Sequence, residues 1–220
     1  MDRPGDRPGD GAVDMAAIAA RAPVIPVLTI ERLETAVPLA RALVRGGLPV
    51  LEITLRTAAA LEAIRAVAAE VPEALVGAGT VLDPAQLDQV QRAGACFAVS
   101  PGCTEALARA ARSSGMPFLP GVQTVSEAMA LGGLGFEILK FFPADAAGGL
   151  TWIKAVGAPL SGVRFCPTGG ITAETAPAYL ALPNVACVGG SWVAPRVAVA
   201  TGDWQSVERL AATASALKRR

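Results

Sequence analysis

Lys140 is the residue of this 220-residue chain whose type and surroundings most clearly indicate chemistry. It interrupts an apolar run, residues 138–143, whereas Lys154 and Lys218 have the surroundings of surface residues. An unpaired charge in such a run costs several kcal/mol, so burial favours the neutral amine, which is nucleophilic. The pattern therefore predicts that Lys140 is a nucleophile. The alternative is an inert buried ion pair.

Glu52 and Arg56 bracket the end of a second apolar run, residues 50–54. Strand alternation places Glu52, Thr54 and Arg56 on one face, where a carboxylate and a guanidinium would enter one cavity. The carboxylate can transfer protons, and the guanidinium can bind a substrate carboxylate through two hydrogen bonds. Two other pairings stay open: Glu52 with Lys140, or Glu52 with Arg56.

Glycines and hydroxyl groups follow three further apolar runs. Thr80 comes after Gly77-Ala78-Gly79, and its hydroxyl can donate a hydrogen bond to a carboxylate. Gly169-Gly170 and Gly189-Gly190, the latter followed by Ser191, close the last two runs. Backbone N–H groups in such loops bind phosphate in many α/β barrels, although tight turns also use Gly-Gly.

The chain has no histidine, which excludes Ser-His-Asp and Cys-His nucleophiles and histidine-ligated zinc. Its four cysteines form no C-x-x-C pair. Cys96, Cys166 and Cys187 lie in apolar runs, so we expect buried structural thiols there. Cys103 follows Pro101-Gly102 in a loop and is expected to be more exposed.

Eight short apolar runs predict the strands that position these side chains: residues 24–28, 50–54, 75–79, 96–99, 118–120, 138–141, 164–166 and 185–188. Stretches with helical spacing separate them. Asp83-Pro84, Thr104, Thr124 with Glu127, and Thr172 each have the pattern of a helix N-terminus.

Alternating strands and helices predict an α/β fold, a (β/α)8 TIM barrel in a single domain. The competing open sheet would normally carry G-x-G-x-x-G after its first strand, and this chain has none there. In such a barrel the active site lies at the carboxyl ends of the strands, where the polar residues named above are found. A helix over residues 13–20 is expected before the first strand.

Composition is consistent with one domain, residues 13–220, after a polar and disordered extension, residues 1–12, that is no signal peptide. The 19 basic and 19 acidic residues balance, so neither nucleic acid nor a membrane is an expected partner. Apolar runs stay shorter than the ~18 residues of a membrane span. We expect a cytoplasmic protein.

Six segments together resemble the 2-keto-3-deoxy-6-phosphogluconate (KDPG) aldolase family, the class I enzymes of the Entner–Doudoroff pathway. They are VLEITLRT (50–57), VGAGTVL (76–82), SPG (100–102), LKFFPA (139–144), RFCPTGGI (164–171) and GGSW (189–192). The similarity runs from about Pro23 to Trp204. K-F-F-P and P-T-G-G-I together are highly specific to this family.

The resemblance implies a metal-independent lyase without a cofactor, acting as a homotrimer. It would cleave KDPG to pyruvate and glyceraldehyde 3-phosphate, with possible activity on 4-hydroxy-2-oxoglutarate. It also implies roles for the residues: Lys140 for the Schiff base, Glu52 as general acid and base, Arg56 and Thr80 for the pyruvate carboxylate, Pro101 and Phe142 around the pyruvyl group, Thr168 beside the substrate chain, and Gly169, Gly170, Gly190 and Ser191 for phosphate.

Three alternatives remain open from the sequence. The substrate could be the galactonate epimer, or 4-hydroxy-2-oxoglutarate, which lacks phosphate. A phosphosugar isomerase or epimerase barrel is disfavoured by the absence of histidine. A non-catalytic phosphate-binding barrel would keep Lys140 and Glu52 as an ion pair. Cys103, a departure from the family beside the site, leaves open a redox sensitivity or an altered substrate preference.

Overall fold

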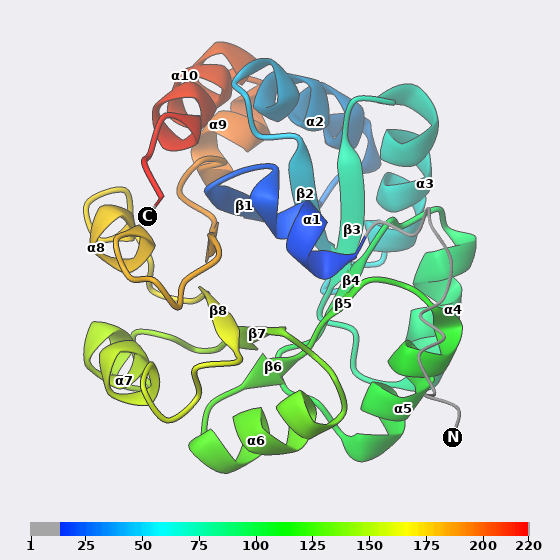
Figure 1. Ribbon diagram of the computed structural model, residues 1–220. Helices are drawn as coiled ribbons and strands as arrows, with labels where there is room; N and C mark the ends of the chain where they lie inside the picture. The colour runs from blue at the N-terminus through cyan, green and yellow to red at the C-terminus, as the bar shows by residue number, and fades with distance from the viewer. Residues whose placement is uncertain (1–13, 220) are drawn as a thin grey trace.

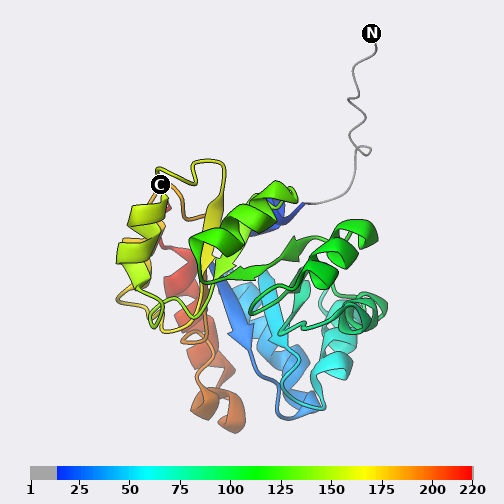
Figure 2. The same ribbon diagram turned by 90° about the horizontal axis from the view of Figure 1, so that it is seen from below.

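The strands lie at the centre of the molecule, and the helices lie outside them (Figure 1; Figure 2). The computed structural model describes residues 14–219, so the predicted extension lies outside the described residues. Parallel pairing arranges the strands in the orders β5-β4-β3-β2-β1-β9 and β6-β7-β8. Their bounds are β1 (Val24–Leu28), β2 (Val50–Thr54), β3 (Leu75–Gly79), β4 (Ala98–Val99), β5 (Phe118–Leu119), β6 (Gly121–Val122), β7 (Ile138–Phe141), β8 (Arg164–Pro167) and β9 (Val188–Gly190).

The two sheets meet at two places. Pro120 separates β5 from β6, because proline has no N–H to donate to the ladder. On the other side, the parallel bridges Phe165↔Val185 and Thr168↔Gly189 connect β8 to the β9 segment. The parallel sheet is therefore curled, an α/β arrangement that collects the carboxyl ends of the strands at one end.

Four predicted strands, those over 24–28, 50–54, 75–79 and 138–141, have the predicted bounds. The prediction of a strand over 185–188 was wrong by three residues, because β9 begins only at Val188 and Val185 makes an isolated bridge. Cys96 was expected to be buried in a strand, but it is exposed in the bend before β4. Cys166 and Cys187 are buried, as expected.

The helices fill the connections between strands, and three of the four helix N-termini predicted from their capping residues are confirmed. Asp83 accepts a hydrogen bond from Gln86 N at 2.8 Å, and Thr124 forms the predicted capping box with Glu127. The bounds are α1 (Met15–Ala20), η1 (Leu33–Thr35), α2 (Ala36–Arg45), α3 (Ala60–Glu70), α4 (Pro84–Arg92), α5 (Glu105–Ser114), α6 (Val125–Gly133), α7 (Gly149–Val156), α8 (Ala176–Leu180), α9 (Arg196–Thr201) and α10 (Trp204–Ser215).

The helix predicted to open at Thr172 begins later than expected. Thr172 N donates to Thr175 Oγ1 at 2.9 Å, and Thr175 N donates to Thr172 Oγ1 at 3.3 Å. These hydrogen bonds hold the two threonines in a turn, because their side chains compete for the backbone donors. Helix α8 therefore starts at Ala176.

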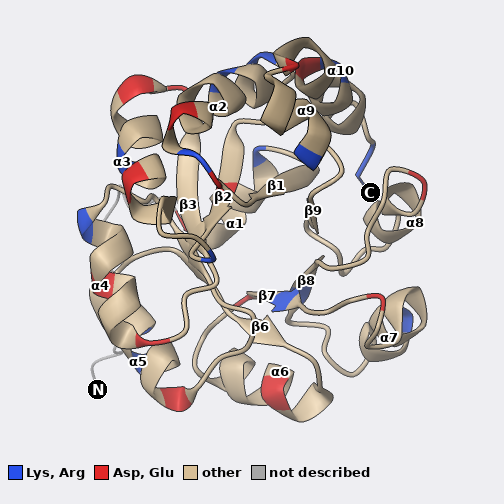
Figure 3. Ribbon diagram, turned by 180° about the vertical axis from the view of Figure 1, so that it is seen from behind, with Lys and Arg blue, Asp and Glu red and all other residues tan. Residues whose placement is uncertain are grey.

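An apolar cluster fills the interior near the amino ends of the strands. It includes Ile25, Val50 and Ile138, each at or near the start of its strand, and α1 adds Met15 and Ile18. Apolar side chains fill the interior at the amino ends of the strands, and the polar side chains of the strands lie towards the carboxyl ends. Acidic and basic residues are spread over the outer helices (Figure 3). No helix in the described range is long and apolar enough to span a membrane.

Candidate active site

A buried charge pair joins β7 to β2. Lys140 Nζ donates a hydrogen bond to Glu52 Oε1 at 3.2 Å, and the two side chains are only 4% and 3% exposed. Each sits within a short apolar strand, so neither charge has much access to water. The two residues predicted for chemistry are thus in contact although they lie 88 positions apart. A proton can pass between an amine and a carboxylate at this distance without any rearrangement.

Arg56 and Thr80 form a second contact beside this pair. Arg56 Nε donates to Thr80 Oγ1 at 3.3 Å, and Arg56 lines the cavity. Thr80 has φ 61°, a left-handed conformation that is unusual for a β-branched residue and often found at functional sites. The suggested pairing of Arg56 with Glu52 is wrong, because Glu52 is paired with Lys140. Arg56 is therefore available to an anion.

Thr168 and Phe142 complete the wall around the amine. Thr168 is 5% exposed and donates from Oγ1 to the carbonyl of Cys166 at 3.3 Å. Gly189 leaves room for it, since a Cβ there would lie 2.9 Å from Thr168 Cγ2. Lys140 Nζ lies 5.2 Å from the centre of the Phe142 ring, within the range of a cation–π interaction.

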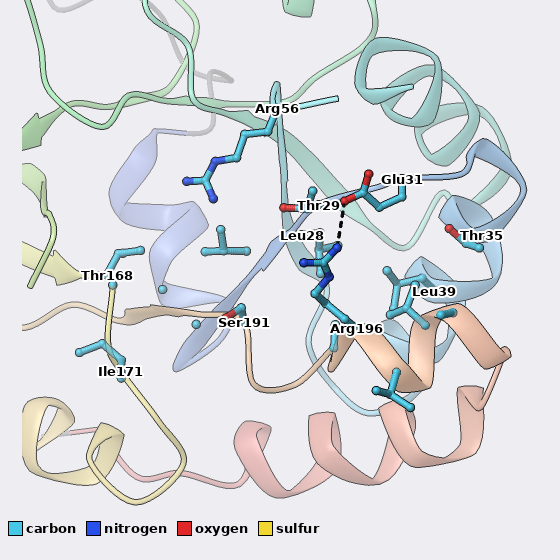
Figure 4. Close-up of a pocket in the computed structure, with 18 of the residues that line it drawn as sticks. Leu28, Thr29, Glu31, Thr35, Leu39, Arg56, Thr168, Ile171, Ser191 and Arg196 are labelled. Carbon is cyan, nitrogen blue, oxygen red and sulfur yellow. Dashed lines mark ion pairs between the residues drawn. The ribbon is translucent and has the colours of Figure 1, made fainter. Parts of the chain in front are cut away.

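A cavity of about 790 Å³ opens in front of these residues (Figure 4). Eight of the eleven predicted site residues line it: Lys140, Arg56, Phe142, Thr168, Gly169, Gly170, Gly190 and Ser191. Glu52 and Thr80 reach it only through their hydrogen bonds to lining residues. Pro101 is not in the wall, and its carbonyl instead packs against Gly121, the strand partner of Lys140.

The glycine loops adopt backbone conformations that side chains disfavour. Gly169 and Gly170 have φ of 96° and 78°. A Cβ on Gly170 would also lie 3.1 Å from Asp145 Cγ, and one on Gly190 would lie 2.7 Å from Trp192 Cη2. At this part of the cavity wall the glycines expose their backbone and Ser191 adds a hydroxyl, which suits an anion that is bound by N–H and O–H groups.

The sequence analysis missed a group of cavity residues that follow β1 and begin α9. Thr29, Glu31 and Arg32 lie directly after β1, and Arg196 is the first residue of α9. The rule that barrel sites lie at carboxyl ends of strands could have found the first three.

Cys103 is half-buried on the loop after β4. Burial raises the pKa of its thiol to about 11, although a hydrogen bond from Ser100 acts in the opposite direction. The thiol is therefore protonated near neutral pH and is a poor nucleophile.

The family model and the curated relatives agree on one family. The model of the family described as KDPG and KHG aldolase matches residues 15–210. The KHG/KDPG aldolase of Escherichia coli is 53% identical over 195 residues, which are 89% of this chain and 92% of that protein.

Solved structures of relatives are similar over nearly the whole chain, and two of them carry a bound molecule. KDPG aldolase from Legionella pneumophila, with pyruvate captured as a covalent carbinolamine intermediate, has a TM-score of 0.91 and 47% identity, covering 92% of this chain and 98% of that one. The Zymomonas mobilis enzyme with 3-phosphoglycerate has a TM-score of 0.90 and 49% identity, covering 95% and 98%.

Proposed function

Because the chain belongs to the KDPG and KHG aldolase family, we propose that it cleaves KDPG to pyruvate and glyceraldehyde 3-phosphate as a class I aldolase. The observation that carries the proposal is the buried amine of Lys140, 3.2 Å from a carboxylate and in the wall of the cavity. Covalent pyruvate in the Legionella relative and 3-phosphoglycerate in the Zymomonas relative support the same chemistry here.

Imine formation is the first step of this reaction. Glu52 takes a proton from Lys140, and the neutral Nζ attacks the keto carbon C2 to give a carbinolamine. Glu52 gives the proton back to the C2 hydroxyl, which leaves as water, and an iminium ion forms. Because the iminium ion accepts an electron pair, it supplies the electron sink that bond cleavage at C3 requires.

Bond cleavage follows. Glu52, acting through a water molecule, removes the proton of the C4 hydroxyl, and the C3–C4 bond breaks with its electrons moving towards the iminium ion. Glyceraldehyde 3-phosphate leaves, and an enamine remains on Lys140. Protonation at C3 and hydrolysis then release pyruvate and return the free amine.

The two ends of the substrate would use different parts of the cavity. We assign its carboxylate to Arg56 and Thr80, and its phosphate to the loops that contain Gly169-Gly170 and Gly190-Ser191. Phe142 and Thr168 would contact the carbon chain between them. Pro101 would not contact the substrate, and would instead support the strand beside Lys140 by packing against the backbone of Gly121. Binding the remote phosphate can align the reacting bond.

We infer that the two sheets form one closed eight-stranded barrel in a single domain, with β5 and β6 as one strand interrupted at Pro120. The continuity at Pro120 and the bridges between β8 and β9 support this closure. We also propose a homotrimer, for which exposed apolar side chains offer contact surface: Leu33, Leu82, Val125, Met129 and Val197. Sedimentation velocity should give three times the 22.3 kDa of one chain.

A coupled assay tests the function. Pyruvate released from KDPG is followed with lactate dehydrogenase, and glyceraldehyde 3-phosphate is measured separately. We expect equal amounts of both products, unchanged by a chelator. Lys140→Met should be inactive, while the matched Lys154→Met variant keeps its activity. Folded wild-type protein that releases no pyruvate would overturn the proposal.

A further inference from the structure

An ion pair lies at the rim of the cavity and has no role in the steps above. Arg196 Nη2 is 3.6 Å from Glu31 Oε1, and both residues line the cavity (Figure 4). Glu31 comes from the segment after β1, and Arg196 begins α9. A charge pair from two separate elements therefore faces the space that the substrate would enter.

This ion pair is weak enough to be exchanged. Its side chains are 92% and 61% exposed, and 3.6 Å is longer than an ordinary hydrogen bond. Exposed pairs of this kind contribute about 0–1 kcal/mol. A stronger anion at the rim can therefore take the guanidinium of Arg196 from Glu31 at little cost.

Apart from Arg196, the described residues place only one cation in the cavity wall that is not assigned to the pyruvyl end, Arg32. A phosphate group carries about −1.5 to −2 charges, whereas the Gly-Gly loops and Ser191 provide only neutral donors. Four cationic residues line the cavity among the described residues: Arg32, Arg56, Lys140 and Arg196. Arg56 and Lys140 are assigned to the pyruvyl end.

Arg32 and Arg196 differ in how they are held. Arg32 is paired with Glu34, which does not line the cavity, and it also contacts the carbonyl of Ala200. Arg196 is five residues from Ser191, on the segment that leaves β9, and its own partner Glu31 lies inside the cavity. An incoming phosphate would repel Glu31 and attract Arg196, which favours the exchange.

We propose that Arg196 is a specificity residue that leaves Glu31 to bind the phosphate group of the substrate. Glu31 then competes with the ligand for Arg196, and ligands with little negative charge do not displace it. The assignment rests on the proposed function and adds a residue to it. It predicts that removing Arg196 affects phosphorylated ligands alone, and that removing the charge of Glu31 strengthens their binding.

Steady-state kinetics on the full chain tests this with KDPG, with inorganic phosphate as inhibitor, and with pyruvate in borohydride trapping. Arg196→Met should raise KM for KDPG and weaken phosphate inhibition by roughly three- to tenfold, with kcat nearly unchanged. Half-saturation by pyruvate should not change. Glu31→Gln should lower KM for KDPG, and this gain should disappear in the double variant. Arg45→Met, which removes an exposed ion pair with Glu208 outside this cavity, is the matched control.

The outcomes separate the two proposals. An unchanged KM for KDPG in Arg196→Met, or an equal change for pyruvate, would refute the role of Arg196. If wild-type protein is trapped by pyruvate and cleaves KDPG, that refutation leaves the aldolase function intact. If wild-type protein is not trapped and does not cleave KDPG, the function itself fails, and the role of Arg196 fails with it.

Discussion

The Glu52 carboxylate occupies the space that a side chain at position 79 would need. A Cβ on Gly79 would overlap Oε1 of Glu52 and lie 2.7 Å from its Cγ. The same oxygen accepts the hydrogen bond from Lys140. The glycine at the end of β3 therefore lets the carboxylate reach the amine.

Gly79→Ala should accordingly reduce activity more than it reduces stability. The new methyl group would push Glu52 away from Lys140, and a misplacement of about 1 Å can cost about a hundredfold in rate. We expect kcat for KDPG cleavage to fall by about that factor, measured with the coupled assay. Gly162→Ala is the control, because no atom lies within 4 Å of a Cβ there. Normal turnover in Gly79→Ala would show that the position of Glu52 is unimportant.

Lys140→Met should destabilise the fold, because it leaves the carboxylate of Glu52 buried without its cation. Breaking a buried pair costs about 3–5 kcal/mol. Adding Glu52→Gln to Lys140→Met should recover much of this loss, since both charges are then gone. Urea unfolding of the wild type and the two variants measures the difference. Equal free energies of unfolding for the single and double variants would argue against the pair.

Gly170→Ala should weaken binding of the phosphorylated substrate. At φ 78°, and with Asp145 beside it, a side chain at this position must distort the loop. We expect KM for KDPG to rise by about tenfold, as strain of 1–3 kcal/mol permits, while pyruvate trapping stays normal. Gly115→Ala is the control, because Gly115 has a similar φ of 69° and an added Cβ there would have no atom within 4 Å. Gly115 does not line the cavity. Equal effects of the two variants would contradict a phosphate loop.

Cys103 should react slowly with iodoacetamide near neutral pH. Its pKa is raised to about 11, so the thiolate, which is the reactive form, is scarce below that pH. The labelling rate should rise about tenfold for each pH unit between 8 and 10. Mass spectrometry of the peptide that contains Cys103 measures the rate. Fast labelling at pH 7 that no longer increases with pH would show a reactive thiolate and revive a redox role.

Burial could be predicted wherever it depends only on the residues of a single strand. Lys140 and Glu52 each interrupt an apolar strand, so their burial followed from their neighbours in the sequence. The bounds of β9 could not be predicted in this way. Val185 and Val188 are both apolar, and only the pairing with β8 and β1 decides where the ladder begins.

The ion pair at the rim of the cavity could not be predicted from the sequence for a different reason. Glu31 and Arg196 lie 165 positions apart, in exposed segments with no apolar periodicity, and only the curl of the sheet brings them together. Pro101 was assigned through the family resemblance, but its place depends on how the loop after β4 packs against Gly121.

Borohydride trapping with pyruvate, followed by mass mapping of the adduct, tests the central claim most directly. The Schiff-base mechanism predicts one reduced pyruvyl group per chain, attached to Lys140 and absent from Lys140→Met. A label on Lys154, or no label on folded protein, would contradict it.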